Sequence, residues 1–275
     1  MSKKQFEKLD DEVFSIVDAR NARLQKSYQD ILPELRALFL QMEEKWGVDG
    51  NLSFPDLNKY NRFDQLVGKM EAISGGVFKN IVRDIDEDLQ EIYVRSYNTT
   101  GGIIQEATGS AVRGSLQTEV LQKALKTPVG GLTIDLRMDR IRDDLADKMT
   151  SVVTRGVQNG DSWTKIAKEF KSEGGKNLST VQRIVRTEGH RLEEQAKLDV
   201  AQKSRKPLLK VWTSERDSRV RALHIAMDGQ IRELDEDFNS PSGASGQAAG
   251  QLNSPEDDIN CRCYSVYIEK PEEKQ

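Results

Sequence analysis

The sequence is poor in cysteine and in aromatic residues, and it lacks long apolar stretches. Its two cysteines, Cys261 and Cys263, cannot supply the disulfide framework of a small secreted domain, so we expect a reducing compartment. No stretch of roughly 18 apolar residues occurs, which excludes a membrane-spanning helix. No apolar segment follows the first residues, Met1 to Phe6, so we do not expect export through a signal peptide.

Charge, by contrast, is abundant, since 31% of the residues are charged, and the net charge of -4 hides an uneven distribution. Residues 164–210 hold 12 Lys and Arg against 6 Asp and Glu, whereas residues 228–275 hold 4 against 11. A basic helical segment could contact DNA, and an acidic segment could contact a basic protein. The simpler interpretation is that both blocks are solvated helix faces.

Apolar residues at spacings of three and four run through the first two-thirds of the chain and predict long amphipathic helices. Pro33 is expected to kink or split the first helix, because proline lacks an amide hydrogen and its ring clashes with the preceding turn. Glycine pairs and polar clusters predict further chain breaks. These breaks are expected at residues 48–51, 75–76, 98–102, 127–131 and 159–160.

The clearest helix start in the sequence is the capping-box pattern Ser179-Thr180-Val181-Gln182. In the helix that would follow, Glu188 lies on an otherwise apolar stripe and therefore needs a partner, for which Arg186 and Arg191 are candidates. His190 lies on the polar face, which is typical of a surface histidine.

The pattern changes after Lys206-Pro207, where alternating apolar residues predict short strands over residues 208–213, 230–234 and 263–268. We therefore predict an α+β fold, with a mainly helical N-terminal two-thirds followed by a small β-containing C-terminal module. The expected domains are residues 1–130, a helical N-terminal region; residues 131–206, the helical part of the module; and residues 207–275, its small β-rich part.

Cys261, Cys263 and His224 form the most distinctive chemical pattern in the chain. Side chains two residues apart in an extended segment point to the same side, so both sulfur atoms can face one point. His224 would complete a set of two cysteines and one histidine, which zinc favours, and Asp228, Asp258 or water could supply a fourth ligand. The alternative is that the cysteines are small packing residues and that His224 is held by hydrogen bonds.

A catalytic function has less support in the sequence. A cysteine and a histidine could act as nucleophile and base, oriented by Asp217 or Asp228, in a Cys-dependent or metal-dependent hydrolase. Acidic groups near a thiol, however, raise its pKa and so lower the fraction of reactive thiolate. The sequence also contains neither a Walker-type phosphate loop nor a dinucleotide-binding fingerprint, so we expect a protein that is not an enzyme.

An ordered series of short motifs runs from residue 186 to residue 263. Its members are Arg186 and Glu188 on a helix, Trp212 on a strand, Asp217, Arg219, Arg221 and His224, the pair Asp228 and Gly229, residues 237–238 and 240–243, and the run Asn260, Cys261, Arg262 and Cys263. In this order the motifs resemble the phage Mu F-like head morphogenesis family of minor head proteins. The resemblance covers about residues 135–268, roughly half of the chain.

The resemblance implies a virion protein that binds the portal protein, in the phage head interior near the portal, after assembly in the host cytoplasm. It implies roles in procapsid assembly and in DNA packaging or ejection, with scaffold or major capsid protein as further partners and no catalytic activity. Residues 1–130 would then contact the portal or the scaffold. A toxin domain, which follows the module in some relatives, is not expected, because only residues 270–275 follow the last predicted strand.

The family also bears on the candidate metal site. Some members have a C-x-x-C in place of Arg221-x-x-His224, and a histidine near Asp258. This exchange resembles a structural zinc site with varying ligands, here His224, Cys261, Cys263 and Asp258. Because this chain has Arg221 and Asp258 where relatives have ligands, a complete set of four ligands is not established by the resemblance.

Double-stranded DNA is an alternative partner, through the basic helix expected over residues 180–205. The candidate phosphate contacts are Arg183, Arg186, Arg191 and Lys197. Binding of this kind would weaken steeply with salt concentration.

Overall fold

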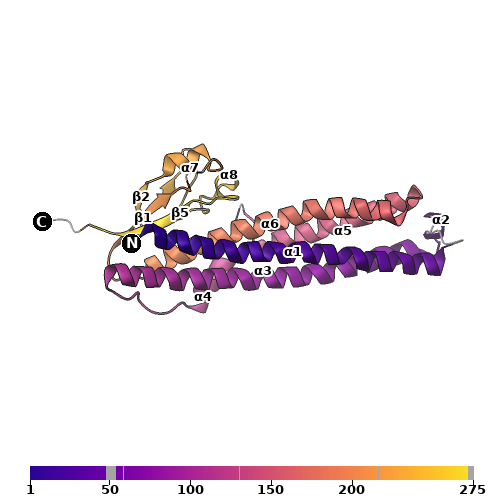
Figure 1. The fold of residues 1–275 in the computed structure, drawn as a ribbon, viewed down its shortest axis with the longest axis horizontal. Coiled ribbons are helices and arrows are strands. Elements are labelled where there is room, and N and C mark those ends of the chain that lie inside the picture. Colours follow the sequence, from indigo (N-terminus) through magenta and orange to yellow (C-terminus); the bar gives the residue numbers. More distant parts are fainter. Residues whose placement is uncertain (48–53, 58, 130, 216, 272–275) are drawn as a thin grey trace. The chain divides into compact units, whose positions relative to one another are not determined.

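The computed structural model describes residues 1–47, 54–57, 59–129, 131–215 and 217–271, and Figure 1 shows the course of the chain. The chain divides into two compact units that are interleaved along the sequence. The sheet unit consists of Met1–Ala19, Asp86–Ile134 and Arg183–Gln275, and the helical unit consists of Arg20–Ile85 and Asp135–Gln182. Residues 1–130 and 131–206, which we expected to be separate domains, each contribute to both units, because their long helices run from one unit into the other.

Long amphipathic helices make up most of the chain, as the sequence predicted. Each buries an apolar stripe, for example Phe6, Leu9 and Val13 in the first helix. Within the described ranges, none of the helices is both long and apolar enough to cross a membrane. The helices of the first 201 residues are α1 (Lys3–Trp46), α2 (Phe54–Leu57), the 3-10 helix η1 (Lys59–Asn61), α3 (Arg62–Thr108), α4 (Thr118–Leu125), α5 (Ile134–Gln158) and α6 (Trp163–Ala201).

Several predicted chain breaks lie inside helices instead. Helix α1 is not split at Pro33, and α3 continues through residues 75–76 and 98–102. Tyr97, Thr100 and Ile104 are buried around the last of these, so tertiary packing outweighs the weak helix propensity of the segment. The breaks at 127–129 and 159–160 do lie outside helices, whereas the one at 48–51 lies outside the described residues.

The helix start predicted at Ser179 is also wrong, because α6 begins at Trp163 and continues through the capping-box pattern. The hydroxyl groups of Ser179 and Thr180 donate to the carbonyl oxygen of Lys176 at 2.8 and 3.2 Å. A bond of this kind to the preceding turn is the alternative that serine and threonine use inside a helix, where no free amide is left to cap.

In the helical unit, α5 buries one face, and a buried amide on α6 links it to two other helices. The side-chain amide of Asn177, on α6, donates to the carbonyl oxygen of Ile141 at 3.0 Å and accepts a hydrogen bond from the hydroxyl of Tyr28. This buried amide therefore joins three helices of the unit, since Tyr28 belongs to α1. The buried residues of α5 are Met138, Ile141, Leu145, Met149, Val152, Val153, Gly156 and Val157.

The sheet unit contains a three-stranded antiparallel sheet in the order β2-β1-β5 (Figure 1). The three strands match the three segments predicted from the alternating pattern. A separate pair, β3 and β4, lies in the long loop between them. The elements are β1 (Leu208–Thr213), α7 (Ala222–Met227), β2 (Ile231–Glu233), β3 (Phe238–Asn239), β4 (Ser245–Gly246), α8 (Pro255–Asp258) and β5 (Tyr264–Glu269).

Trp212 forms the centre of a small core beside this sheet. Its indole ring is fully buried and meets the rings of His224 and Phe238 edge to face, at centroid distances of 5.5 and 5.3 Å. Both cysteines belong to the same core. The predicted α+β fold, helical first and with a small sheet at the end, is therefore confirmed.

Candidate metal centre

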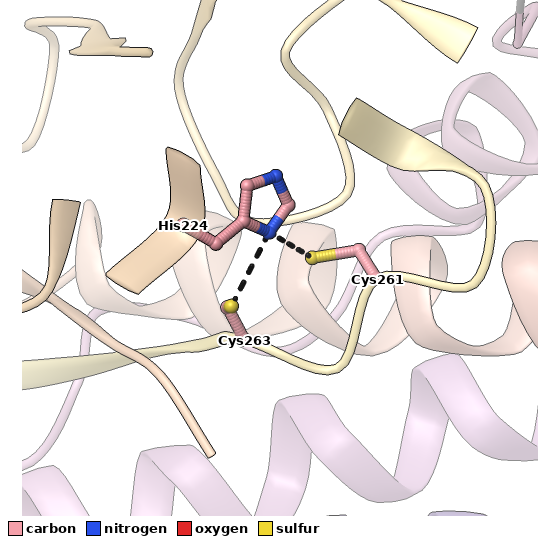
Figure 2. A group of neighbouring side chains, drawn as sticks. All are labelled: His224, Cys261 and Cys263. Atoms are coloured by element: carbon pink, nitrogen blue, oxygen red, sulfur yellow. Dashed lines mark hydrogen bonds between the residues drawn. The ribbon is translucent and has the colours of Figure 1, made fainter. Parts of the chain in front are cut away.

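Three of the predicted ligands lie together in the sheet unit (Figure 2). The Nδ1 atom of His224 lies 3.6 Å from the Sγ atom of Cys261 and 3.4 Å from that of Cys263. All three side chains are buried, with exposed fractions of 1%, 4% and 1%. The arrangement predicted from the Cys-x-Cys spacing and a single histidine is therefore present, among buried side chains.

Local backbone geometry positions the two cysteines. Asn260 adopts a left-handed conformation with φ 55°, which asparagine tolerates better than most residues. Its amide donates to the hydroxyl of Thr187 on α6 at 3.2 Å. The chain therefore turns at Asn260 and enters β5 with Cys261 and Cys263 two residues apart, on the side that faces His224.

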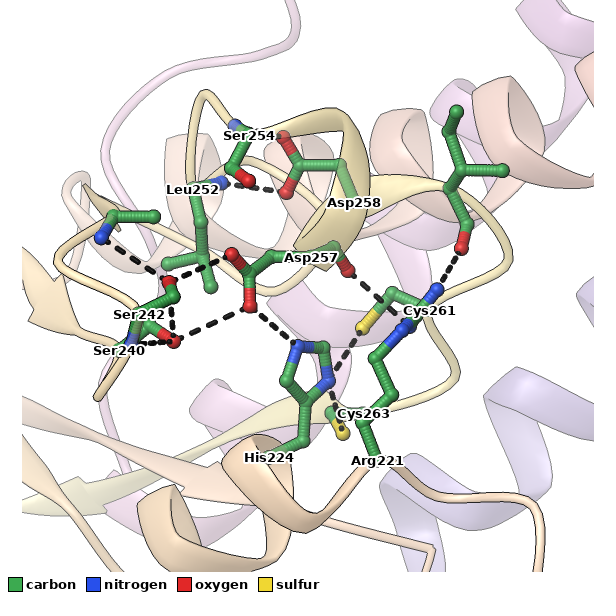
Figure 3. Close-up of polar contacts among 12 residues, drawn as sticks. Arg221, His224, Ser240, Ser242, Leu252, Ser254, Asp257, Asp258, Cys261 and Cys263 are labelled. Atoms are coloured by element: carbon green, nitrogen blue, oxygen red, sulfur yellow. Dashed lines mark hydrogen bonds and ion pairs between the residues drawn. The ribbon is translucent and has the colours of Figure 1, made fainter.

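A carboxylate holds the other side of the histidine ring (Figure 3). The Nε2 atom of His224 lies 3.2 Å from an oxygen of Asp257. Asp257 in turn accepts hydrogen bonds from the hydroxyls of Ser240 and Ser242, at 3.2 and 2.9 Å. Sequence reasoning missed Asp257 and chose its neighbour, although either residue was compatible with the motif.

Asp258, which we expected as a ligand, points elsewhere (Figure 3). Its two carboxylate oxygens accept hydrogen bonds from the backbone amides of Leu252 and Ser254, with N–O distances of 2.7 and 3.2 Å. Asp258 is absent from the group of ligand atoms that the structure brings together. Its carboxylate stabilises the turn before α8, so the structure does not bring it into the cluster. Asp228, the other candidate, accepts the amide of Ser214 at 2.8 Å.

His190 was expected on the surface and is instead buried, with an exposed fraction of 8%. It lies on α6 and lines the same groove as Cys261, but its ligand atoms do not belong to the group formed by His224, Cys261 and Cys263. Its Nε2 atom has no hydrogen-bond partner among the described residues. The chain contains only two histidines and two cysteines. Three of these four residues form the group, and the fourth, His190, lines the groove beside Cys261. Because the chain has so few residues of these two types, the sequence could have suggested His190 as a further candidate ligand.

The charges of the cluster centre on Cys261. Its hydrogen bond to Cys263, and then those to the two histidines, lower the pKa of the Cys261 thiol well below its usual value despite burial. The pKa of Cys263 is raised, because its thiol donates to Cys261 and is buried. Burial opposes protonation of His190 and His224, but the hydrogen bonds to Cys261 outweigh it and raise the pKa of both. The two sulfur atoms therefore form an anionic centre that attracts cations.

Cys261 and His190 also line a groove of about 900 Å³ in the sheet unit. One part of its wall is acidic, with Asp10, Asp11 and Asp18 from α1. The other part is basic, with Arg186, Arg219, Arg221 and Arg262. The groove therefore borders the cluster at Cys261.

The remaining motif residues hold the loops around this site. Arg262 forms two hydrogen bonds to the carboxylate of Asp217, at 2.7 and 2.6 Å, and this pairing is the largest cause of the lowered pKa of Asp217. Arg221 donates to the carbonyl oxygens of Asp257 and Ile259. Arg219 forms an ion pair with Asp217, and Glu188 forms one with Arg191. Gly229 adopts φ 80° in the turn before β2. The side chains of Arg186 and Asn260 are exposed.

A second buried cluster lies further along α6. The Nζ atom of Lys197 lies 2.6 Å from Asp10, 2.6 Å from Glu193 and 2.9 Å from Glu194. All four side chains are buried, and Glu194 also accepts the backbone amide of Ser265 at 2.8 Å. The cluster therefore joins α1, α6 and β5.

The four candidate DNA contacts do not share one surface. Arg183 and Arg186 are exposed on α6, one turn apart. Arg191 is buried against Glu188 and the carbonyl oxygen of Ala124, and Lys197 lies in the carboxylate cluster. The expectation that all four reach phosphates is therefore wrong for Arg191 and Lys197, whose charges are neutralised inside the protein.

Comparison with known proteins places this site in a family segment. Residues 147–266 match the family described as Phage Mu protein F like protein. Over 265 residues the chain is 28% identical to minor head protein GP7 of Bacillus phage SPP1, covering 95% of this chain and 86% of that protein. It is also 26% identical over 153 residues to NAD(+)–arginine ADP-ribosyltransferase EFV of Enterococcus faecalis, covering 54% of this chain and 31% of that protein. No solved structure matches.

The matched segment begins in α5 and ends in β5, so it includes the cluster with its supporting residues. It also lies within the residues that carry the motif resemblance. Residues 147–266, somewhat less than half of the chain, are therefore similar to the Phage Mu protein F like family.

Proposed function

We propose that this protein is a minor head protein of a tailed phage, which binds the portal protein and acts in procapsid assembly and in DNA packaging or ejection. The observation that carries the proposal is the similarity to the minor head protein of Bacillus phage SPP1, which extends over 95% of this chain. The similarity therefore includes residues of both compact units and is wider than the family segment alone. A role in head morphogenesis follows from this similarity.

The contact with the portal or the scaffold is assigned to the helical N-terminal region, residues 1–130. The whole of this region lies outside the family segment, which begins at residue 147. Its long helices α1 and α3 offer extended charged faces for such a contact. The major capsid protein is a further candidate partner. The protein would then reside in the phage head interior near the portal, after assembly in the host cytoplasm.

We propose an interaction protein and no enzyme. The match to the ADP-ribosyltransferase covers only 31% of that protein, so the name of that relative supports no transferase activity here. The cysteines of the cluster are buried, and both ring nitrogens of His224 already have partners. These groups support a role in organising the module, whereas a hydrolase would need a nucleophile that the substrate can reach.

Double-stranded DNA remains a second candidate partner because Arg183 and Arg186 are exposed one turn apart on α6. Two arginines give a modest salt dependence, since each phosphate contact contributes about one to the slope of log affinity against log salt. Absence of binding by the purified protein at ~50 mM salt would eliminate this candidate.

The proposed function is tested by coexpressing the full chain with the portal protein from the same phage. We expect the two proteins to copurify, and we expect a few copies of this chain per particle when virion proteins are counted. The double variant Arg183→Ser, Arg186→Ser serves as a matched control, which should keep portal binding. A chain that does not copurify with the portal and is absent from particles would contradict the proposal.

A further inference from the structure

We propose that His190, His224, Cys261 and Cys263 bind one zinc ion, with His190 as the fourth ligand, and that this ion fastens α6 to the loop before β5. The inference goes beyond the proposed function and does not depend on it. It starts from the buried group of His224, Cys261 and Cys263 and from His190, which is buried and lines the same groove as Cys261.

The three closest groups already have the spacing of a zinc site. Zinc lies about 2.3 Å from thiolate sulfur and about 2.0–2.1 Å from imidazole nitrogen, which in a tetrahedron separates nitrogen from sulfur by about 3.6 Å. The corresponding distances here are 3.6 Å for Cys261 and 3.4 Å for Cys263, both measured to Nδ1 of His224. A zinc ion therefore fits among these atoms with little movement.

Asp257 prepares His224 to act as a ligand (Figure 3). Its carboxylate accepts a hydrogen bond from Nε2, so the proton of the neutral ring is held on that atom. The lone pair then belongs to Nδ1, the atom that faces both sulfur atoms (Figure 2). A carboxylate behind a metal-binding histidine is the usual means of fixing its tautomer and orientation.

The fourth ligand must come from elsewhere, because Asp258 and Asp228 are both engaged by backbone amides. His190 is the remaining group. It lines the same groove as Cys261, it is buried, and its Nε2 atom has no hydrogen-bond partner among the described residues, which is costly for a buried nitrogen. It is not one of the three residues whose ligand atoms lie within 4.8 Å of one another, so its ring would have to move closer to bind the same ion. A ligand role would satisfy it.

The neighbouring loop leaves room for this ring. Gly250 has φ 69°, and a Cβ atom there would lie 3.0 Å from the Cδ2 atom of His190. A larger residue would press on the ring, so the glycine allows the loop to pass His190 closely.

Charge balance also favours this set of ligands. Two thiolates neutralise a divalent ion, and two neutral imidazoles add no charge, so the buried centre becomes neutral overall. Thiolate and imidazole ligands together select zinc over magnesium or calcium, which prefer oxygen.

The test uses the full chain, purified without added metal, first for zinc content and then, after exchange for a magnetically active cadmium isotope, by NMR. We expect one zinc ion per chain and scalar coupling from cadmium to the ring protons of both histidines and to both cysteines. No second histidine pair or cysteine pair exists in the chain to confuse the assignment.

The variant Asp258→Asn is the matched control and should leave all four couplings unchanged. Coupling to His224 and the cysteines without coupling to His190 would overturn the assignment of the fourth ligand. A metal-free chain that also fails to bind added zinc or cadmium would overturn the site as a whole. Because the wild-type protein gives these readings, the result does not depend on whether a His190 variant folds.

Discussion

Two buried polar clusters share helix α6 in the sheet unit and differ in one respect, the source of positive charge. The carboxylate cluster, Asp10, Glu193, Glu194 and Lys197, contains its own cation, whose ammonium group contacts all three acids. The cysteine–histidine cluster, His224, Cys261 and Cys263 with His190 on the adjoining groove, contains sulfur atoms that favour a cation and no permanently charged side chain.

The comparison teaches how to separate a metal site from an ion-pair network. Both clusters bring three potential ligand atoms together. In the carboxylate cluster, however, the position that a metal would occupy is taken by Lys197, whose pKa is raised well above its usual value because the three acids outweigh the effect of burial. Burial and the acids around it also raise the pKa of Glu193 well above normal. That cluster is complete without an external ion.

The largest effect is expected from Lys197→Met, which removes the internal cation and leaves three buried acids. Losing one partner of a buried ion pair costs roughly 3–5 kcal/mol. Urea unfolding measures the loss, which should be smaller in acid, because protonated carboxyl groups need no cation. As a control, Lys148→Met breaks an exposed pair with Asp144 and should cost about 0–1 kcal/mol. Equal costs for the two variants would contradict the comparison.

The next effect concerns zinc removal from the cysteine–histidine cluster. A ligand present at ~100 times its dissociation constant stabilises the folded state by about 2.7 kcal/mol. A chelator should therefore lower the unfolding temperature of the wild type, and zinc should restore it. Cys263→Ser should abolish this response, whereas Lys197→Met should keep it. A chelator response in Cys263→Ser equal to that of the wild type would show that the ion binds elsewhere.

A smaller effect is expected from Asp257→Asn, which weakens the support behind His224. Loss of a supporting group of this kind typically lowers metal affinity by roughly 10–100-fold. Competition with a chromogenic chelator measures the change. Ser242→Ala removes one hydrogen bond to Asp257 and should have a weaker effect in the same direction. An unchanged affinity in Asp257→Asn would separate the carboxylate from the metal site.

The last effect comes from Lys210, a buried lysine on β1 that lacks the carboxylate cage of Lys197. It donates to the carbonyl oxygens of Leu234 and Gln247, and burial lowers its pKa to about 8 despite acids nearby. Between pH 8 and its ordinary value of 10.5 the unfolded chain binds more protons at this residue. Its contribution to stability must therefore rise with pH across that window.

The difference in unfolding free energy between the wild type and Lys210→Met isolates this contribution. It should shift in favour of the wild type as pH rises from 8 toward 10.5. A difference that does not change with pH would show that Lys210 keeps an ordinary pKa.

Much of the fold was predictable because the apolar periodicities are clear. The strands at 208–213 and 263–268 and the α5 helix follow from alternation and from three-and-four spacing. The chain breaks predicted at the glycine and polar segments 75–76 and 98–102 were wrong, because local helix propensity does not include the tertiary contacts that keep α3 continuous. Local sequence patterns also did not predict that the two units are interleaved along the sequence.

The site was predictable in part for a similar reason. Residue spacing correctly brought Cys261, Cys263 and His224 together. It failed at His190, because Glu188, Arg191, Glu193 and Lys197 make its neighbourhood look solvated. Those charges are in fact buried and paired with one another or with partners on other elements, which a sequence pattern does not reveal.

The most direct test of the central claim, that the cysteine–histidine cluster takes its cation from outside, is a native mass spectrum of the full chain. The account predicts one zinc ion per chain in the wild type and in Lys197→Met, and none in the double variant Cys261→Ser, Cys263→Ser. A metal-free wild type, or zinc retained by the double variant, would contradict it.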